Sequence, residues 1–327
     1  MPIPDFRDAP VLVTGGAGFI GSHLVDALVA RGARVHVLDD LSSGSADNLA
    51  HHRGAVDLQR GDLRDLDECR RACRQVRFAF HLAARGSVPR SLEDPATTIA
   101  VNVGGTANLF AAAREAGVER VVYASSSSVY GDDERLPKRE GEEGRPLSPY
   151  ALSKVMDEEL AATFGGRFDM ELVGLRFFNV YGPRQSPEGP YAAVVPRFLA
   201  AARSGAAMEI HGDGEQSRDF TYVDDAVEAA LLAAGAPREA CGRAYNVGGG
   251  NRVTLNELAA RLALIAGCSV APVHAEPRPG DVRHSHADLT AVRAALGFVP
   301  RVSLDEGLRR LWLAAQAAGS QREPARG

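Results

Sequence analysis

Short apolar runs alternate with amphipathic segments through the first 125 residues of the chain. The apolar runs lie at residues 11–14, 34–38, 56–63, 77–82 and 118–124. Such runs are typical of buried parallel strands, whereas the segments between them, such as residues 22–30 and 95–115, have apolar residues at helical spacing. This alternation predicts an α/β fold built on a doubly wound parallel sheet, with ligands at the carboxyl ends of its strands.

The pattern changes beyond residue 182. Pro183, Pro187, Gly189 and Pro190 mark a loop-rich passage, and residues 194–202 then return to helical periodicity. At 327 residues the chain is long enough for two domains or lobes. We therefore expect a second, smaller lobe after this break.

A glycine-rich turn directly follows the first predicted strand. Gly15, Gly18 and Gly21 permit a tight turn and close approach of a pyrophosphate, and the helix after them offers unpaired N–H groups to its phosphates. Asp39 ends the second strand, where it can accept hydrogen bonds from both ribose hydroxyls and would repel a 2′-phosphate. These residues predict a dinucleotide site that takes NAD in preference to NADP.

Three further residues follow the third and fourth strands at the same predicted edge. Asp62 is expected beside the adenine, and the small Ala83 and Ala84 let a nicotinamide nucleotide pass close to the backbone. Asn102 lies on the next predicted helix. All of these positions fit one site along the carboxyl edge of the sheet.

The predicted domains follow from this arrangement. Residues 1–177 are assigned to an NAD-binding Rossmann domain, with later return segments at about residues 209–248. Residues 178–327 are assigned mainly to a smaller C-terminal α/β lobe, and the family resemblance given below implies that this lobe is substrate-binding. The polar tail, residues 319–327, is expected to be disordered.

Candidate chemistry centres on a predicted helix that begins at Ser148 and Pro149, a capping residue and a ring that fits the first turn. Tyr150 and Lys154 are four residues apart and therefore lie on one face of this helix. A phenol is a poor base at neutral pH, and a nearby ammonium favours its deprotonated form. Only two of the chain's 37 Lys and Arg residues are lysines, which makes this pairing informative.

A run of serines at residues 125–128 follows the fifth predicted strand. Serine runs are usually flexible loops, but this one lies at the edge of the sheet where ligands bind. A hydroxyl can both donate and accept hydrogen bonds, which suits orienting a sugar hydroxyl near Tyr150.

Composition and charge exclude several classes of protein. The net charge is −5 and no basic stripe is present, so we expect no nucleic-acid partner. No apolar run reaches transmembrane length and the N-terminus has no secretory pattern, so we expect no membrane partner and a cytoplasmic location. Four cysteines are too few for a disulfide framework in this chain. No metal site is predicted, because neither Cys69 with Cys73 nor His284 with His286 has further ligands nearby.

These motifs resemble the extended short-chain dehydrogenase/reductase family and, within it, the nucleotide-sugar 4-epimerases. The resemblance extends from about residue 11 to residue 311, with the motifs in family order. The matching segments are residues 14–21, Asp39, residues 61–63, 81–84 and 125–131, Tyr150 with Lys154, and residues 175–183, 218–225 and 278–282.

The resemblance implies a hydride shuttle through a 4-keto sugar, with NAD tightly bound and regenerated in each cycle. Tyr150 would take the proton from the sugar O4 hydroxyl, and Lys154 would bind the nicotinamide ribose and maintain the phenolate. Ser126 matches the residue that hydrogen-bonds O4. Ser127 and Ser128 remain alternatives for that contact.

The resemblance also implies two sets of binding residues. The cofactor set is Gly15, Gly18, Phe19, Ile20, Gly21, Asp39, Asp62, Leu63, Ala83, Ala84, Asn102, Tyr150, Lys154 and Phe177. The substrate set is Ser87, Ser127, Ser128, Asn179, Val195, Arg218, Arg278, Asp281 and Ser285. In the substrate set, Asn179, Arg218 and Arg278 match phosphate contacts. Asp281 matches a ligand of the nucleoside ribose.

Two positions bear on the choice of reaction. Related dehydratases have an acidic residue after the catalytic Ser or Thr, where this chain has Ser127 and Ser128. Ser285 aligns with a gate beside the sugar, and a small residue there leaves room for an N-acetyl group. Residues 280–285 and 86–91 are most similar to those of UDP-N-acetylglucosamine 4-epimerases.

We therefore expect interconversion of UDP-GlcNAc and UDP-GalNAc, with UDP-glucose and UDP-galactose as a second pair. UDP-glucuronate 4-epimerases are the main alternative, although Asn179 replaces the threonine expected in them. A nucleotide-sugar dehydratase and a non-catalytic NAD-binding protein are further alternatives. The family's pairing of two helices, here near residues 104–116 and 150–163, predicts a homodimer.

Overall fold

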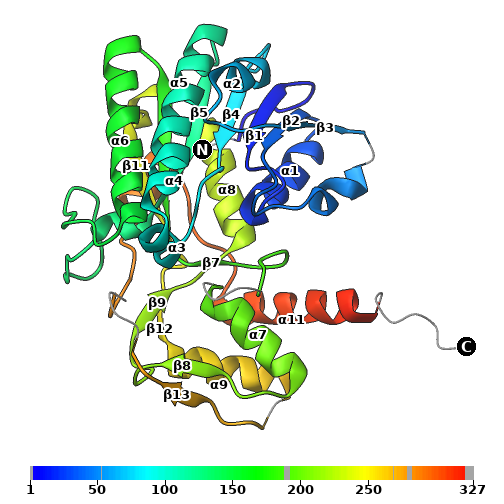
Figure 1. Cartoon of the computed structure of the whole chain (residues 1–327), viewed down its shortest axis with the longest axis vertical. Helices are drawn as coiled ribbons and strands as arrows, with labels where there is room; N and C mark the ends of the chain where they lie inside the picture. The colour runs from blue at the N-terminus through cyan, green and yellow to red at the C-terminus, as the bar shows by residue number, and fades with distance from the viewer. Residues whose placement is uncertain (1–2, 53, 188–191, 268, 278–281, 321–327) are drawn as a thin grey trace, which may run out of the picture.

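The computed structural model describes residues 3–52, 54–187, 192–267, 269–277 and 282–320. Seven strands form one sheet in the order β11-β6-β5-β4-β1-β2-β3, and every neighbouring pair is parallel (Figure 1). The strands are β1 (Pro10–Thr14), β2 (Arg34–Asp39), β3 (Val56–Arg60), β4 (Phe78–His81), β5 (Arg120–Ser126), β6 (Glu171–Phe177) and β11 (Arg243–Val247). The predicted doubly wound parallel sheet is confirmed.

Helices cover both faces of this sheet because successive strand side chains point to opposite sides. In β1, Val11 and Val13 join one hydrophobic core and Leu12 joins the other. The first core includes α1 (Phe19–Val29), α8 (Val223–Ala234) and α10 (Thr290–Leu296). The second core includes α2 (Leu66–Ala72), α5 (Gly105–Ala116) and part of α6 (Pro149–Phe168).

The helical segment predicted at residues 95–115 is interrupted. Asp94 caps α4 (Pro95–Ile99), a π-helical turn follows at η2 (Ala100–Gly104), and α5 continues from it. A short helix, α3 (Val88–Glu93), precedes them. Single π-turns within a helix are frequent at functional sites, and this one carries Asn102.

The smaller lobe lies below the sheet in Figure 1. Its helices are α7 (Val194–Ser204), α9 (Leu255–Ala266) and α11 (Leu304–Ser320), which share a core that includes Phe198, Leu258 and Leu308. Strands β8 (Glu209–His211) and β13 (Val273–Ala275) pair there, as do β9 (Ser217–Asp219) and β12 (Arg252–Thr254). A two-stranded sheet of β7 (Val180–Tyr181) and β10 (Thr221–Tyr222) leads into this lobe.

The domain boundaries stay a prediction. Within the predicted return segment, residues 209–248, α8 and β11 pack with the large sheet, whereas β8 and β9 pair inside the smaller lobe. Residues 319 and 320, which were expected in the disordered tail, end α11, and residues 321–327 lie outside the described residues. None of the described helices combines the length and apolar character that a bilayer crossing requires.

Candidate active site

The carboxyl ends of β1 to β5 border a cavity of about 410 Å³, which we call the glycine-loop cavity. Its wall contains ten of the predicted cofactor residues: Gly15, Gly18, Phe19, Ile20, Gly21, Asp39, Asp62, Leu63, Ala83 and Ala84. The structure therefore gathers residues from four separate loops at the edge where a parallel sheet binds its ligands.

The glycines are required by the backbone of this turn. Gly15 has φ +69°, and a Cβ there would lie 2.7 Å from the backbone nitrogen of Ala83. A Cβ on Gly21 would lie 2.0 Å from the carbonyl oxygen of Gly15. Gly18 precedes α1 without a side-chain cap, so the first N–H groups of that helix remain available to an anion at the cavity wall. This arrangement fits the pyrophosphate of a dinucleotide.

The carboxylate of Asp39 is fixed by two backbone amides. Ala17 N–H donates to Oδ2 at 2.9 Å and Leu41 N–H donates to Oδ1 at 2.8 Å. Burial raises the pKa of Asp39, and these two hydrogen bonds oppose that shift. Each oxygen has a second lone pair for a ribose hydroxyl. Asp62 differs, because its hydrogen bonds with Arg64 lower its pKa and hold it charged at the cavity wall.

The start of α6 is as predicted. The side chain of Ser148 accepts a hydrogen bond from Ala151 N–H at 3.1 Å, and Pro149 occupies the first turn. Tyr150 N–H donates to the Ser91 hydroxyl of α3 at 3.1 Å. These contacts fix the backbone that carries Tyr150 next to the segment that lines the cavity.

Lys154 is only 3% exposed, and its ammonium makes two hydrogen bonds. Nζ donates to the carbonyl of Ala124, a residue of the cavity wall, and to Oδ2 of Asp157, both at 3.0 Å. Burial lowers the pKa of Lys154, but the charges of Asp157 and Tyr150 outweigh burial, so the pKa is raised. Lys154 therefore stays protonated, and its interaction with Tyr150 is electrostatic.

Ser126 is distinguished from the neighbouring serines by its hydrogen bonds. Its Oγ accepts from the backbone N–H of Ser128 at 3.2 Å and from the Ser128 hydroxyl at 3.0 Å. Both bonds use Ser126 as the acceptor, which leaves its own proton to donate elsewhere. This geometry favours Ser126 over Ser128 as the hydrogen-bond donor to a substrate oxygen.

Asn102 and Phe177 are not wall residues of the glycine-loop cavity. The Asn102 side chain is buried, accepts from Arg85 N–H at 2.8 Å and donates to the Ser153 hydroxyl at 2.8 Å. The Asn102 side chain therefore links the loop after β4 to Ser153 of α6, which is the residue before Lys154. Phe177 is buried at the end of β6, in register with Ser126.

A second cavity, of about 430 Å³, lies between the sheet and the smaller lobe, and we call it the interlobe cavity. Its wall includes the predicted substrate residues Ser87, Asn179, Val195 and Arg218. It shares five wall residues with the glycine-loop cavity: Gly86, Ser87, Gln185, Ala192 and Ala193. The two cavities are therefore contiguous, as a cofactor and a substrate that react together require.

Asn179 has an unusual backbone, with φ +34° at the corner between β6 and β7. Its side chain donates to the Asp219 carbonyl at 3.0 Å, which holds the corner against β9. Arg218 donates from its guanidinium to the Ser217 carbonyl at 3.0 Å and also lines the interlobe cavity. Both side chains are therefore positioned by backbone groups of the smaller lobe.

The remaining predicted substrate residues are not in the described walls of either cavity. Ser127 and Ser128 are half-buried in the turn after β5. Ser285 is buried, and its N–H donates to the Ser217 carbonyl at 3.0 Å. Arg278 and Asp281 lie outside the described residues.

Sequence reasoning missed three polar side chains at this site. Asp157 could have been found from its spacing, since it is three residues after Lys154 and lies on the same helical face. Gln185 and Gln216 line the interlobe cavity, and each has a buried side-chain oxygen without a hydrogen-bond partner among the described residues. No sequence pattern indicates either glutamine.

Comparisons with known proteins agree with this geometry. A family model described as the NAD dependent epimerase/dehydratase family matches residues 11–248. UDP-glucose 4-epimerase of Mycolicibacterium smegmatis is 42% identical, over 91% of this chain and 96% of that protein. Relatives with other activities also match, among them a dTDP-glucose 4,6-dehydratase of Streptomyces griseus, 38% identical over 91% of both chains.

Two solved structures are especially similar. UDP-glucose 4-epimerase of Thermus thermophilus, in complex with NAD, is 39% identical with a TM-score of 0.87, over 94% of this chain and 99% of that one. UDP-N-acetylglucosamine 4-epimerase of Methanobrevibacter ruminantium, in complex with UDP-N-acetylmuramic acid, is 37% identical with a TM-score of 0.90. The match covers 95% of this chain and 99% of that one.

Proposed function

This chain belongs to the NAD dependent epimerase/dehydratase family, and we propose that it epimerises UDP-sugars at C4, with UDP-GlcNAc and UDP-GalNAc as its preferred pair. It is an NAD-dependent nucleotide-sugar 4-epimerase. The observation that carries the proposal is the Tyr150–Lys154 pair on α6, where the Lys154 ammonium donates to the carbonyl of Ala124, a wall residue of the glycine-loop cavity.

The cofactor is NAD, which supplies the hydride acceptor for C4 and then the hydride donor to the opposite face. Tyr150 removes the O4 proton as C4 is oxidised, and it returns that proton to O4 when the 4-keto sugar is reduced. Ser126 donates a hydrogen bond to O4. Lys154, held by Asp157 and the Ala124 carbonyl, stabilises the phenolate of Tyr150.

The residues after Ser126 favour epimerisation over dehydration. Loss of water from a 4-keto sugar requires a further acid to protonate the leaving hydroxyl. This chain has Ser127 and Ser128 at those positions, and a serine hydroxyl is a poor proton donor at neutral pH. We infer that the 4-keto sugar is reduced again before it reacts further.

The preference for an N-acetylhexosamine rests on the small Ser285 and on similarity to the Methanobrevibacter enzyme. UDP-glucose is the proposed second substrate. UDP-glucuronate remains the alternative, supported by the sequence of residues 125–131 and 176–178. Gln185 and Gln216 each offer an unpaired amide oxygen that could accept a hydrogen bond from the nucleotide or the sugar.

We also propose that the protein is a cytoplasmic homodimer. Leu152 and Met156 form an exposed apolar pair on α6, where a second copy could pack.

The test is the Tyr150→Phe variant, with Tyr245→Phe as its control, because the Tyr245 hydroxyl donates to the Ala240 carbonyl in the core, away from both cavities. Tyr150→Phe should lower kcat by about 10²–10⁴-fold while the purified protein keeps its bound NAD. Tyr245→Phe should remain active. Unchanged turnover in Tyr150→Phe would contradict the mechanism.

A further inference from the structure

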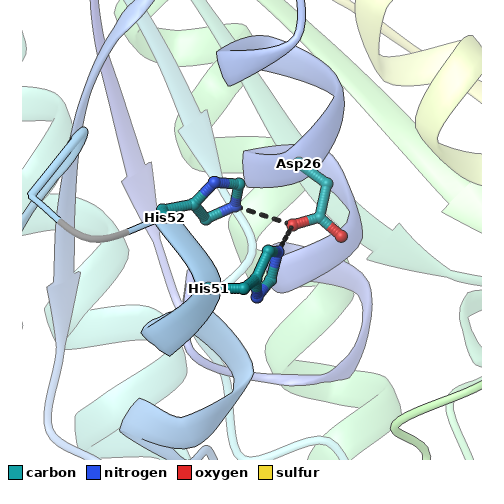
Figure 2. Close-up of side chains that lie close together, drawn as sticks. All are labelled: Asp26, His51 and His52. Carbon is teal, nitrogen blue, oxygen red and sulfur yellow. Dashed lines mark hydrogen bonds and ion pairs between the residues drawn. The ribbon is translucent and has the colours of Figure 1, made fainter.

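Three potential metal-binding side chains converge on the outer side of α1. Asp26 lies on α1, and His51 and His52 end η1 (Ala46–His52), the 3₁₀ helix that follows β2 (Figure 2). Asp26 Oδ1 lies 2.9 Å from His51 Nε2 and 2.8 Å from His52 Nε2. All three donor atoms are within 4.8 Å of one another, and they form the one such group found among the described residues.

The second oxygen of Asp26 is already occupied. Arg184 donates to Oδ2 at 2.5 Å, and its guanidinium also contacts the Asn48 carbonyl and Nδ1 of His23. Arg184 therefore forms an ion pair with this carboxylate on the side away from the two histidines. Arg184 thus fixes the carboxylate and leaves Oδ1 as the single oxygen that can bind a metal.

The group is also accessible from solution. The His51 side chain is 56% exposed and the Asp26 side chain 33%, whereas that of His52 is 10% exposed. One face is therefore open to an incoming ion and to water ligands. The other face is held by the packed ring of His52.

We propose that Asp26 Oδ1, His51 Nε2 and His52 Nε2 form a binding site for a Zn²⁺-class transition-metal dication, with water as the fourth ligand, and that the ion replaces the Nε2 protons that the two imidazoles donate to Oδ1. Two imidazoles and one carboxylate are ligands that Zn²⁺ prefers, at about 2.0–2.2 Å. A tetrahedral ion needs donors about 3.3 Å apart, so each of the two Asp26–His separations has to open by only a few tenths of an ångström. Ca²⁺ and Mg²⁺ prefer oxygen ligands and fit this site poorly.

The position of the site gives metal binding a structural effect. An ion would join α1 to η1, which follows the cavity-wall residues Ser42 and Ser43. Through Asp26 and Arg184 it would also restrain the loop that carries Gln185, a wall residue of both cavities. Metal binding should therefore raise the melting temperature of the protein, independently of its activity.

The test is titration of tag-free protein with Zn²⁺ by calorimetry, with Co²⁺ absorption to report the ligand set. We expect one ion per chain, and at least tenfold weaker binding in each of His51→Gln, His52→Gln and Asp26→Asn. His36→Gln is the matched control, because His36 pairs with Asp57 at 2.7 Å but has no second imidazole. Binding to this control should equal that of the wild type.

Two outcomes would overturn the proposal. One is the absence of saturable Zn²⁺ binding to the wild-type protein. The other is unchanged binding in a His51→Gln/His52→Gln double variant, which would assign the ion to another site such as the half-buried thiol of Cys241. Basal epimerase activity, measured without added metal, should be the same in all the histidine variants and serves as the check on folding.

Discussion

Lys154 carries its charge in a nearly dry position. Its ammonium forms an ion pair with Asp157, which is 1% exposed, and also donates a hydrogen bond to the Ala124 carbonyl. Asp157 thus sets how much positive potential reaches Tyr150. Its carboxylate keeps Lys154 protonated, but it also weakens the electrostatic stabilisation that Lys154 gives to a phenolate at Tyr150. At the residue scale, Asp157 is a positioning residue that acts through Lys154.

The Asp157→Asn variant tests this role. Asp157 is the charge that contributes most to raising the pKa of Lys154, so its removal should lower that pKa and move the alkaline-side midpoint of the kcat–pH profile to lower pH. The charge of Lys154 would then lack its partner, which costs on the order of 3–5 kcal/mol and should lower the melting temperature. The measurement is kcat as a function of pH.

Glu159→Gln is the matched control, since Glu159 is exposed on the same helix. Glu159→Gln removes the same charge from the chain, and the midpoint of its kcat–pH profile should equal that of the wild type. If Asp157→Asn reduced activity without moving the midpoint, Asp157 would have a purely structural role.

At the scale of elements, His81 connects β4 to its neighbours. Thr106 of α5 donates its hydroxyl proton to the Asn102 carbonyl, so His81 Nε2–H donates to Thr106, and Nδ1 accepts from Thr14 of β1. The neutral ring is thus fully hydrogen-bonded. Burial, followed by the charge of Lys154, lowers the pKa of His81 to about 3.

This low pKa predicts how stability depends on pH. Between about pH 6.5 and pH 3 the unfolded chain binds a proton at His81 and the folded protein does not. The contribution is fully present above pH 6.5 and is lost as the pH falls, by about 1.4 kcal/mol per pH unit. The free energy of unfolding of the wild type, measured at pH 7, 6 and 5, should fall with this slope. In His81→Gln the slope should be smaller by the contribution of one proton.

His274→Gln provides the comparison, because His274 is exposed on β13. It should leave the slope unchanged. Equal slopes in the wild type and His81→Gln would show that His81 is protonated in the folded protein.

Much of the sheet was predictable, because its inner strands are short apolar runs that pack on both faces. The cap at Ser148 and the pairing of Tyr150 with Lys154 were also predictable, since both depend on local spacing. The pairing of β11 with β6 was not predicted, because it joins strands separated by the smaller lobe. Nor does a hydrophobic pattern reveal the single π-turn that orients Asn102.

Contacts between distant polar residues account for the rest. Asp157, Glu158 and Glu159 are consecutive acids that look like a solvated helix face, yet Asp157 is buried on Lys154 and Glu158 pairs with Arg176. Asp26 meets His51 and His52 only after α1 and η1 have packed together. Such contacts depend on tertiary structure, which a single sequence does not display.

At the scale of the whole molecule, two lobes bring two contiguous cavities together. The sheet provides the glycine-loop cavity, and the smaller lobe closes the interlobe cavity over the shared wall residues Ser87 and Gln185. Asn179 and Arg218 lie in the wall of the interlobe cavity, away from the glycine-rich turn. The architecture fits a reaction in which hydride passes between two bound molecules and neither product leaves in between.

The proposed homodimer is tested at the same scale. Leu152 and Met156 are 43% and 37% exposed on α6, so a Leu152→Glu/Met156→Glu variant should sediment near the chain mass of 34.7 kDa. The wild type should sediment at about twice that mass. Leu313→Glu, on the exposed face of α11, is the control and should remain dimeric. A wild-type mass near 34.7 kDa at micromolar concentration would rule out the dimer.

The most direct test of the central claim is an assay for epimerisation without added cofactor. Purified protein is incubated separately with UDP-GlcNAc, UDP-glucose and UDP-glucuronate, and the anomeric proton signals are followed by NMR. We predict conversion of UDP-GlcNAc to its C4 epimer, driven by NAD that remains bound through purification, while conversion of UDP-glucuronate alone would select the alternative substrate. A 6-deoxy-4-keto product, or no conversion in any sample after NAD is restored, would contradict the account.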